Sequence, residues 1–162
     1  MQIEVYNQLK HQKAVQDLVL DIQNTEFHLN ITAEDQPDLP DLELFYQQNG
    51  GMFWVALHEQ KIVGCIGFQS LDTENAVLRK MFIQKDFRGK EWNLALQLLQ
   101  ILEDFANQHL YKIIWLDTPL VTHASHRFYE KNGFKEISMH SIPINYKLPQ
   151  GKFPMKIYQK IL

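Results

Sequence analysis

The sequence is short of cysteine and of long apolar runs. Its single cysteine, Cys65, excludes an intrachain disulfide and a metal site built from several cysteines, and its apolar surroundings favour a small buried side chain. No stretch approaches the roughly 18 consecutive apolar residues of a membrane helix. The polar start of the chain, residues 1–10, is unlike a signal peptide. We therefore expect a cytoplasmic protein with no membrane partner.

An excess of positive charge is also lacking, which argues against nucleic acid as a partner. The formal net charge is −3 and the isoelectric point is near 6.1, whereas nucleic-acid binders usually carry a net basic surface. The basic residues at positions 85–90 form only a local cluster, so any anionic partner is expected to be small. The length of 162 residues predicts one self-sufficient domain over residues 1–162, since no linker or repeat divides it.

Hydrophobic periodicity predicts strands and helices along the whole chain. Strands are expected at residues 3–6, 52–58, 62–68, 77–83, 112–116, 135–140 and 152–161. Helices are expected at residues 11–27, 40–48, 93–107 and 123–132. The unbroken apolar run at 112–116 places that strand in the centre of the sheet. This order predicts an α+β fold, a single mixed and mostly antiparallel sheet of about seven strands flanked by about four helices.

The stretch from Leu78 to Gln100 changes from an apolar strand to a basic loop and then to an amphipathic helix. Arg88 and Lys90 stand just before the helix, where free N–H groups and the helix dipole already carry partial positive charge. Cations are unfavourable at that place unless an anion binds there, which indicates a phosphate site. The alternative is a solvated basic loop in which Glu91 offsets the helix dipole.

Four stretches, in this order, resemble the GNAT family of N-acetyltransferases. FWVALHEQKIVGCIGF resembles the family's second and third strands, and LRKMFIQKDFRGK its fourth strand and pyrophosphate loop. IIWLDT resembles the fifth strand, and HRFYEKNGF the signature helix. The resemblance runs over nearly the whole chain. It implies the family fold, acetyl-coenzyme A as the cosubstrate, and acyl-CoA-dependent transfer of an acetyl group to a primary amine.

The resemblance also implies where the site lies, namely an opening between the fourth and fifth strands. There the backbone of Met81, Phe82 and Ile83 would pair with the pantetheine arm as an added strand. Tyr129 matches the tyrosine that protonates the departing thiolate, and a buried core aromatic is the alternative. Thr122 stands where an asparagine is frequent and keeps a hydroxyl for hydrogen bonding. The pyrophosphate would be held by the loop of Arg88, Gly89, Lys90, Glu91, Trp92 and Asn93.

Three positions depart from the family pattern. Glu91 and Asn93 replace small residues of the loop, and Glu91 brings a carboxylate near the expected phosphates. Arg79 stands where many members carry a glutamate base, and an arginine cannot act as a base. Another carboxylate, a histidine or ordered water would then remove the amine proton; the candidates are Glu26, His28, Asp72, Glu74 and His123. These departures motivate the alternative of a non-catalytic acyl-CoA-binding regulatory module.

Other ligands have weaker support. His123 and His126 stand three residues apart, but no carboxylate or cysteine pattern completes a site, so no metal is predicted. Neither phosphate motif, GxxxxGK[ST] or GxGxxG, occurs. The acidic loop 34–43 either attracts a cationic amine or is solvated surface. The acceptor is expected to be a small-molecule or peptide amine, and a homodimer agrees with the resemblance because dimers are frequent in the family.

Overall fold

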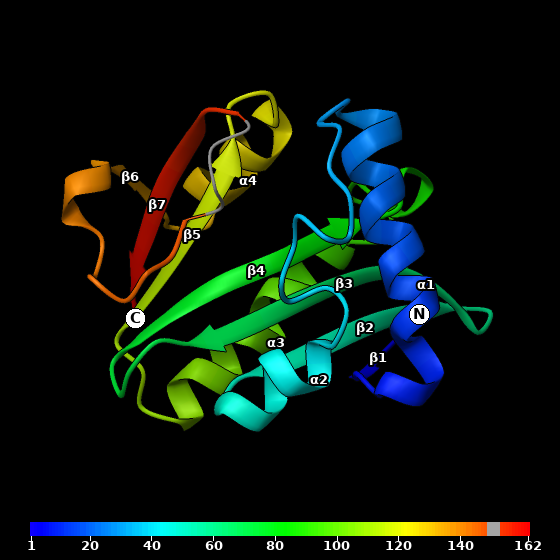
Figure 1. The fold of residues 1–162 in the computed structure, drawn as a ribbon, viewed down its shortest axis with the longest axis horizontal. Coiled ribbons are helices and arrows are strands. Elements are labelled where there is room, and N and C mark those ends of the chain that lie inside the picture. The colour runs from blue at the N-terminus through cyan, green and yellow to red at the C-terminus, as the bar shows by residue number, and fades with distance from the viewer. Residues whose placement is uncertain (149–152) are drawn as a thin grey trace.

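The computed structural model describes residues 1–148 and 153–162, which form a seven-stranded sheet in the order β1-β2-β3-β4-β5-β7-β6 (Figure 1). The strands are β1 (Gln2–Val5), β2 (Met52–His58), β3 (Lys61–Ser70), β4 (Asn75–Ile83), β5 (Ile113–Pro119), β6 (Lys135–Ile137) and β7 (Met155–Ile161). The helices are α1 (Gln8–Asp21), α2 (Leu42–Phe45), α3 (Leu94–Gln108) and α4 (His123–Lys131). Among the described strands only β4 and β5 pair in parallel, and β5 lies inside the sheet. The mixed, mostly antiparallel sheet and the central position of β5 are therefore confirmed.

The first helix differs from its predicted range. It begins at Gln8 because the side chain of Asn7 accepts a hydrogen bond from the Lys10 N–H at 3.1 Å and so caps the first turn. It also gives way to a π-helical turn, Ile22–Glu26, so that the predicted helix 11–27 is two elements. Such π turns are rare and often occur at functional sites.

Other boundaries also differ from the prediction: β4 begins at Asn75 and β5 ends at Pro119, and three further differences arise at turns. The turn between β2 and β3 contains only Glu59 and Gln60, both with positive φ, so Lys61 already belongs to β3. The predicted helix 40–48 is α2 followed by a 3₁₀ turn, Gln47–Asn49. The predicted strand 135–140 stops at β6, because the side chain of Ser138 opens another 3₁₀ turn. Residue 152, the predicted start of the last strand, lies outside the described residues.

Helices cover both faces of the sheet, with α1 and α2 on one face and α3 and α4 on the other (Figure 1). Leu98 and Leu102 of α3 pack with Leu116 of β5 in the larger core. Val15 and Val19 of α1 pack on the opposite face. Among the described residues, no helix is long and apolar enough to cross a lipid bilayer.

Strands β4 and β5 pair only where they begin. Their register runs from Asn75 opposite Ile113 to Val77 opposite Trp115, after which β4 pairs with β3 alone and β5 with β7 alone. The two strands then diverge, as Figure 1 shows. This divergence, called the opening, lies at the place where the resemblance implied an opening between the fourth and fifth strands.

A β-bulge lies in the diverging part of β4. The step from Cys65 to Gly67 on β3 faces the longer step from Phe82 to Arg79 on β4, so β4 holds one extra residue. Lys80 lies in this bulge with φ +50°. The bulge therefore changes which face of the sheet the following side chains of β4 occupy.

The close approach of Gly51 to β3 predicts a large effect of a small substitution. A Cβ at Gly51 would lie 2.1 Å from the carbonyl oxygen of Phe68 and 3.0 Å from that of Tyr46. Because both atoms are backbone, Gly51→Ala should lower the free energy of unfolding by about 3 kcal/mol in urea titrations. Gly89→Ala is the control, since no atom lies within 4 Å of its Cβ, and its φ of +99° should cost only about 1 kcal/mol. Equal losses would contradict the steric explanation.

Candidate active site

Tyr129 of α4 reaches across the opening to β4. Its hydroxyl donates to the Sδ of Met81 at 3.6 Å, and the side chain is buried. The turn after α4 fixes the ring, because the Phe134 N–H donates to the Tyr129 carbonyl at 3.0 Å and the two rings pack 5.6 Å apart. Gly133 allows this turn with φ +91°, as predicted. Burial, and then the charge of Asp117, raises the pKa of Tyr129, so the phenol stays protonated.

The backbone from Met81 to Ile83 forms a strand edge that has no partner strand on the β5 side, where the Ile83 carbonyl accepts a hydrogen bond from Arg88. Side chains alternate along it: Met81 and Ile83 pack toward α3, and Phe82 packs toward α1. On one side Phe82 and Ile83 pair with β3, and on the other side β5 supplies no partner. An extended ligand that carries amide groups can therefore add to this edge as another strand does.

The loop before α3 presents free N–H groups. Within residues 1–148 and 153–162, the N–H groups of Gly89, Lys90, Glu91 and Trp92 have no protein acceptor. The N–H groups at both ends of the predicted phosphate loop are engaged: that of Arg88 donates to Lys85 at 3.2 Å, and that of Asn93 to Gly89 at 3.1 Å. Free N–H groups in succession before a helix form an anion-binding site. The predicted set of six donors is therefore reduced to four.

Trp92 anchors this loop to the sheet. Its ring lies 5.0 Å from that of Phe87 and 5.0 Å from that of His58 at the end of β2. The amide of Gln97 also donates to the Trp92 carbonyl at 2.9 Å. Glu91 is exposed and has no ion-pair partner among the described residues. The loop is thus fixed by an aromatic contact, whereas its acidic side chain lies at the surface.

Arg88 is held on the α1 side of the loop. Its Nε donates to the Ile83 carbonyl at 2.7 Å, and both terminal nitrogens bind the carboxylate of Glu26, one of them at 2.7 Å. Glu26 ends the π-helical turn, so this ion pair links the loop to the segment after α1. Hydrogen bonding to Arg88, opposed in part by desolvation, lowers the pKa of Glu26. This carboxylate is consequently a poor base.

The hydroxyl of Thr122 is already used within the protein. It donates to the Pro119 carbonyl at 2.8 Å and lies 2.7 Å from the hydroxyl of Thr118. The resemblance implied a contact with the cosubstrate, whereas this hydroxyl stabilises the turn that leads into α4. The rings of His123 and His126 are 5.8 Å apart, and no group of three possible metal ligands occurs among the described residues.

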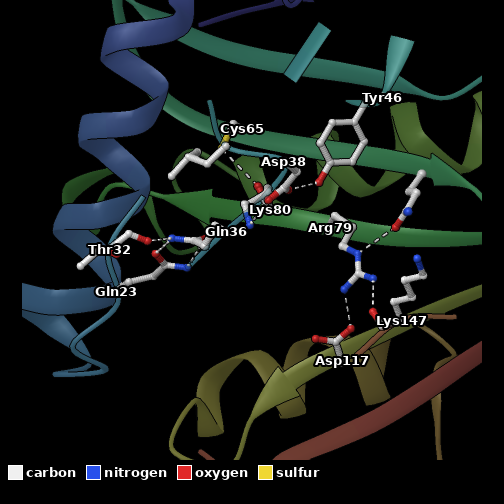
Figure 2. A network of polar contacts seen from close by, with 12 residues as sticks. Gln23, Thr32, Gln36, Asp38, Tyr46, Cys65, Arg79, Lys80, Asp117 and Lys147 are labelled. Atoms are coloured by element: carbon white, nitrogen blue, oxygen red, sulfur yellow. Dashed lines mark hydrogen bonds and ion pairs between the residues drawn. The ribbon is translucent and has the colours of Figure 1, made fainter. Parts of the chain in front are cut away.

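A largely buried arginine crosses the opening on the face opposite Tyr129. Arg79 of β4 binds Asp117 of β5 at 2.7 Å, and it also donates to Gln69 at 3.0 Å and to the Lys147 carbonyl at 2.9 Å (Figure 2). Tyr146 donates to the same carboxylate at 2.5 Å. Burial alone would lower the pKa of Arg79, but Asp117, Tyr146, Tyr46 and Asp38 together outweigh this effect, and the pKa is raised. Arg79 is therefore a permanent cation.

The next residue, Lys80, forms a second buried ion pair. Its Nζ lies 3.1 Å from Asp38, which also accepts a hydrogen bond from the Tyr46 hydroxyl at 2.6 Å (Figure 2). The Cys65 thiol donates to the Lys80 carbonyl at 3.1 Å. Burial raises the pKa of this thiol to about 12, so it remains protonated. Cys65 is confirmed as a small buried residue.

Sequence reasoning missed Lys80, Asp38 and Asp117 as members of the site. Lys80 and Asp117 each interrupt an apolar strand, which was an available signal because charged residues are rarely buried without partners. Asp38 gave no such signal, since it stands in the acidic loop 34–43 among similar neighbours.

The five candidate bases occupy different places. Asp72 and Glu74 lie at the turn before β4, where β4 and β5 are still paired, and hence away from the opening. Glu26 is neutralised by Arg88. The remaining two candidates, His28 and His123, are exposed, and His123 begins the helix that carries Tyr129.

The pair of Arg88 and Glu26 predicts a pH-dependent contribution to stability. Folding lowers the pKa of Glu26 from 4.5, so the contribution is complete above about pH 4.5 and is lost as the pH falls through the folded-state pKa. Because about a third of each side chain is exposed, Glu26→Gln should cost at most about 1 kcal/mol at pH 7 and less at pH 3. Urea titrations at both pH values measure this difference. Asp17→Asn, in an exposed pair with Lys13, is the control, and an equal loss at both pH values would contradict the prediction.

Known proteins resemble the chain in both sequence and structure. Residues 17–134 match the Acetyltransferase (GNAT) family. N-acetylaspartate synthetase of Xenopus tropicalis is 36% identical over 111 residues, which cover 65% of this chain and 40% of that protein. A probable N-acetyltransferase camello of Xenopus tropicalis is 30% identical over 122 residues, which cover 74% of this chain and 55% of that protein. The chain thus spans only about half the length of these two relatives.

Solved structures match over nearly the whole chain. An acetyltransferase from Streptococcus agalactiae is 35% identical with a TM-score of 0.93, covering 99% of this chain and 98% of the other. A GNAT acetyltransferase from Staphylococcus aureus is 30% identical, with the same TM-score and coverage. PaiA N-acetyltransferase from Thermoplasma acidophilum, in complex with coenzyme A, covers 100% of both chains with a TM-score of 0.75, and at 16% identity it shows the fold alone. With the family match and the diverging strands, these likenesses show that the chain belongs to the GNAT family of acetyltransferases.

Proposed function

We propose that the protein is an N-acetyltransferase that moves an acetyl group from acetyl-coenzyme A directly to a primary amine. The observation that carries the proposal is the Tyr129 hydroxyl, which reaches Met81 across the opening between β4 and β5. The loop from Gly89 to Trp92 supplies free N–H groups for a pyrophosphate at the same end of β4. The unpaired edge of β4 supplies hydrogen-bonding groups for the pantetheine arm. Family membership supports this assignment.

The acetyl thioester supplies the activated acyl group, and the residues around the opening orient it. A backbone N–H near Met81 polarises the thioester carbonyl. The nitrogen of the neutral amine bonds to the acyl carbon as the bond from carbon to sulfur breaks. Tyr129 gives its proton to the departing sulfur, and the amine releases a proton to a base or to water. Cys65 is buried, and we expect no acyl intermediate on it.

The proton of the amine needs an acceptor other than Arg79. His28 and His123 are the two histidines among the candidates; both are exposed, and neither has an ion pair among the described residues. A histidine suits this step, because a neutral imidazole can accept a proton from the amine. Ordered water is the other route.

The acceptor is proposed to be a small-molecule or peptide amine. Several relatives are named N-acetylaspartate synthetase, among them the Xenopus tropicalis protein that is 36% identical over its matched segment. That name denotes acetylation of an amino acid. The relatives therefore favour an amino acid within the broader class of amines.

A non-catalytic acyl-CoA-binding regulatory module is the second candidate. The observation that favours it is Arg79, which forms an ion pair where many family members are expected to carry a base. Binding of coenzyme A without release of thiol, across a broad panel of amines, would support this candidate over the enzyme.

Acetyl-coenzyme A is expected to stabilise the protein against heat. Binding to the folded state alone contributes about 2.7 kcal/mol at a ligand concentration of about 100 times Kd. For a chain of this length the melting temperature should rise by about 5–10 °C in differential scanning fluorimetry. ATP at the same concentration is the control. The absence of a shift with acetyl-coenzyme A would contradict both candidate functions.

Tyr129→Phe is expected to lower kcat about 100-fold, because it removes the proton donor. The Kd for coenzyme A should change less than about twofold, since the phenyl ring keeps its packing against Phe134. Thiol release and calorimetric titration measure the two quantities. Tyr111→Phe is the matched control, because the Tyr111 hydroxyl donates to Ser70 at the far end of the sheet. An unchanged kcat in Tyr129→Phe would exclude the proposed acid.

The raised pKa of Tyr129 adds a second expectation for the same assay. A phenol that titrates above its ordinary value of about 10 stays protonated throughout the neutral and mildly alkaline range. Deprotonation of Tyr129 should therefore not lower the kcat of the unmodified protein between pH 7 and about 9. If kcat fell in that pH range in the unmodified protein but not in Tyr129→Phe, the pKa of Tyr129 would be much lower than expected.

A further inference from the structure

The bulge in β4 places two consecutive cations on one face of the sheet. In a regular strand, neighbouring side chains point to opposite faces. Here Arg79 contacts Asp117 and Lys80 contacts Asp38, both on the face of α1 and α2, whereas Met81 returns to the face of α3 and Tyr129. The left-handed φ of Lys80 makes this arrangement possible at a cost of about 1–2 kcal/mol. Strain of this kind tends to persist where function depends on it.

Both cations are almost buried, and each is held by one buried acid. The side chain of Arg79 is 15% exposed and that of Lys80 is 13% exposed, while Asp117 and Asp38 are 6% and 9% exposed. The two acids come from different parts of the chain, β5 and the acidic loop 34–43. The cations are therefore fixed in position from both sides of the opening, as Figure 2 shows.

Lys80 and Arg79 carry more N–H bonds than they have acceptors among the described residues. An ammonium carries three N–H bonds, and Lys80 has one acceptor, Asp38, among the described residues. A guanidinium carries five, and Arg79 has three acceptors there, Gln69, Asp117 and the Lys147 carbonyl. Buried donors are normally satisfied. The remaining N–H groups are thus available to an oxygen ligand on this face of the opening.

The charges in this cluster also restrict the ligand. Arg79 and Lys80 balance Asp38 and Asp117, so no net negative charge attracts a cation. A polycationic amine would place further positive charge next to two fixed cations, which is unfavourable at low dielectric. A carboxylate would instead accept charge-assisted hydrogen bonds from both cations.

We propose that the acceptor amine carries a carboxylate, as an α-amino acid does, and that Lys80 and Arg79 bind this carboxylate. The inference rests on the proposed transferase function and narrows its acceptor. Specificity for the acceptor is then determined by Arg79 and Lys80, the two basic residues that precede Met81 in β4. Arg79 is then a substrate-binding residue at the position where the family resemblance implied a base.

The test compares amino acids with their own amides, which differ in the carboxylate alone. Thiol release from acetyl-coenzyme A is measured for a panel of α-amino acids, the matching α-carboxamides, and polyamines. We expect kcat/KM for the preferred amino acid to exceed that for its amide at least tenfold. Equal rates for acid and amide, or preference for a polyamine, would overturn the inference while leaving the transferase function intact. Release of the thiol at the same rate without any amine would overturn both the inference and the proposed transferase function.

Variants of Lys80 test the residue itself. Lys80→Met should raise KM for the amino acid at least tenfold, leave kcat within about threefold, and bring the ratio of acid to amide close to one. Lys80→Arg should keep the preference for the amino acid over its amide. If Lys80→Met alone unfolds the protein, the double variant with Asp38→Asn removes both members of the ion pair and serves in its place. Lys112→Met, which breaks an exposed pair with Glu74, is the matched control. An unchanged ratio in folded Lys80→Met, with the acetyl-coenzyme A melting shift retained, would overturn the assignment.

Discussion

Strands β4 and β5 exchange hydrogen bonds only from Asn75 to Val77, and the site depends on the place where this pairing stops. Backbone N–H and C=O groups that lose a partner in a buried sheet must find another. Beyond Val77, the edge of β4 is open on one side, and Tyr129 lies across the gap. A strand edge without a partner strand and a tyrosine hydroxyl beside it thus follow from one interruption of the sheet.

Because of the bulge, β4 presents apolar side chains to one face of the sheet and charged side chains to the other. On the side of α3 and α4, Met81 and Tyr129 meet in an apolar environment, which suits a thioester and its leaving group. On the other side, Arg79 and Lys80 are bound by buried acids. Buried ion pairs often contribute little net stability, because desolvation offsets the attraction. The presence of two such pairs at the opening therefore agrees better with the proposed recognition of a polar ligand than with a gain in stability.

Most elements of the fold could be predicted from the sequence because they depend on local patterns. Period-2 and period-3.6 spacing located the strands and helices, and Gly133 with Phe134 marked the end of α4 and hence the position of Tyr129. The bulge could not be predicted, since nothing in the identity of Lys80 requires positive φ. The pairing of Arg88 with Glu26 was also hidden, because it joins residues far apart in the chain.

The loop before α3 explains how the departures from the family pattern can coexist with an anion site. Asn93 takes φ +50°, a left-handed conformation that asparagine tolerates better than most residues, so a small residue is not required there. Because Arg88 is held by Glu26 and by the Ile83 carbonyl, the backbone N–H groups from Gly89 to Trp92 are the donors of this loop that have no acceptor in the described part of the chain. Backbone donors are independent of side-chain identity. Replacement of a small residue by Glu91 therefore leaves this set of donors in place.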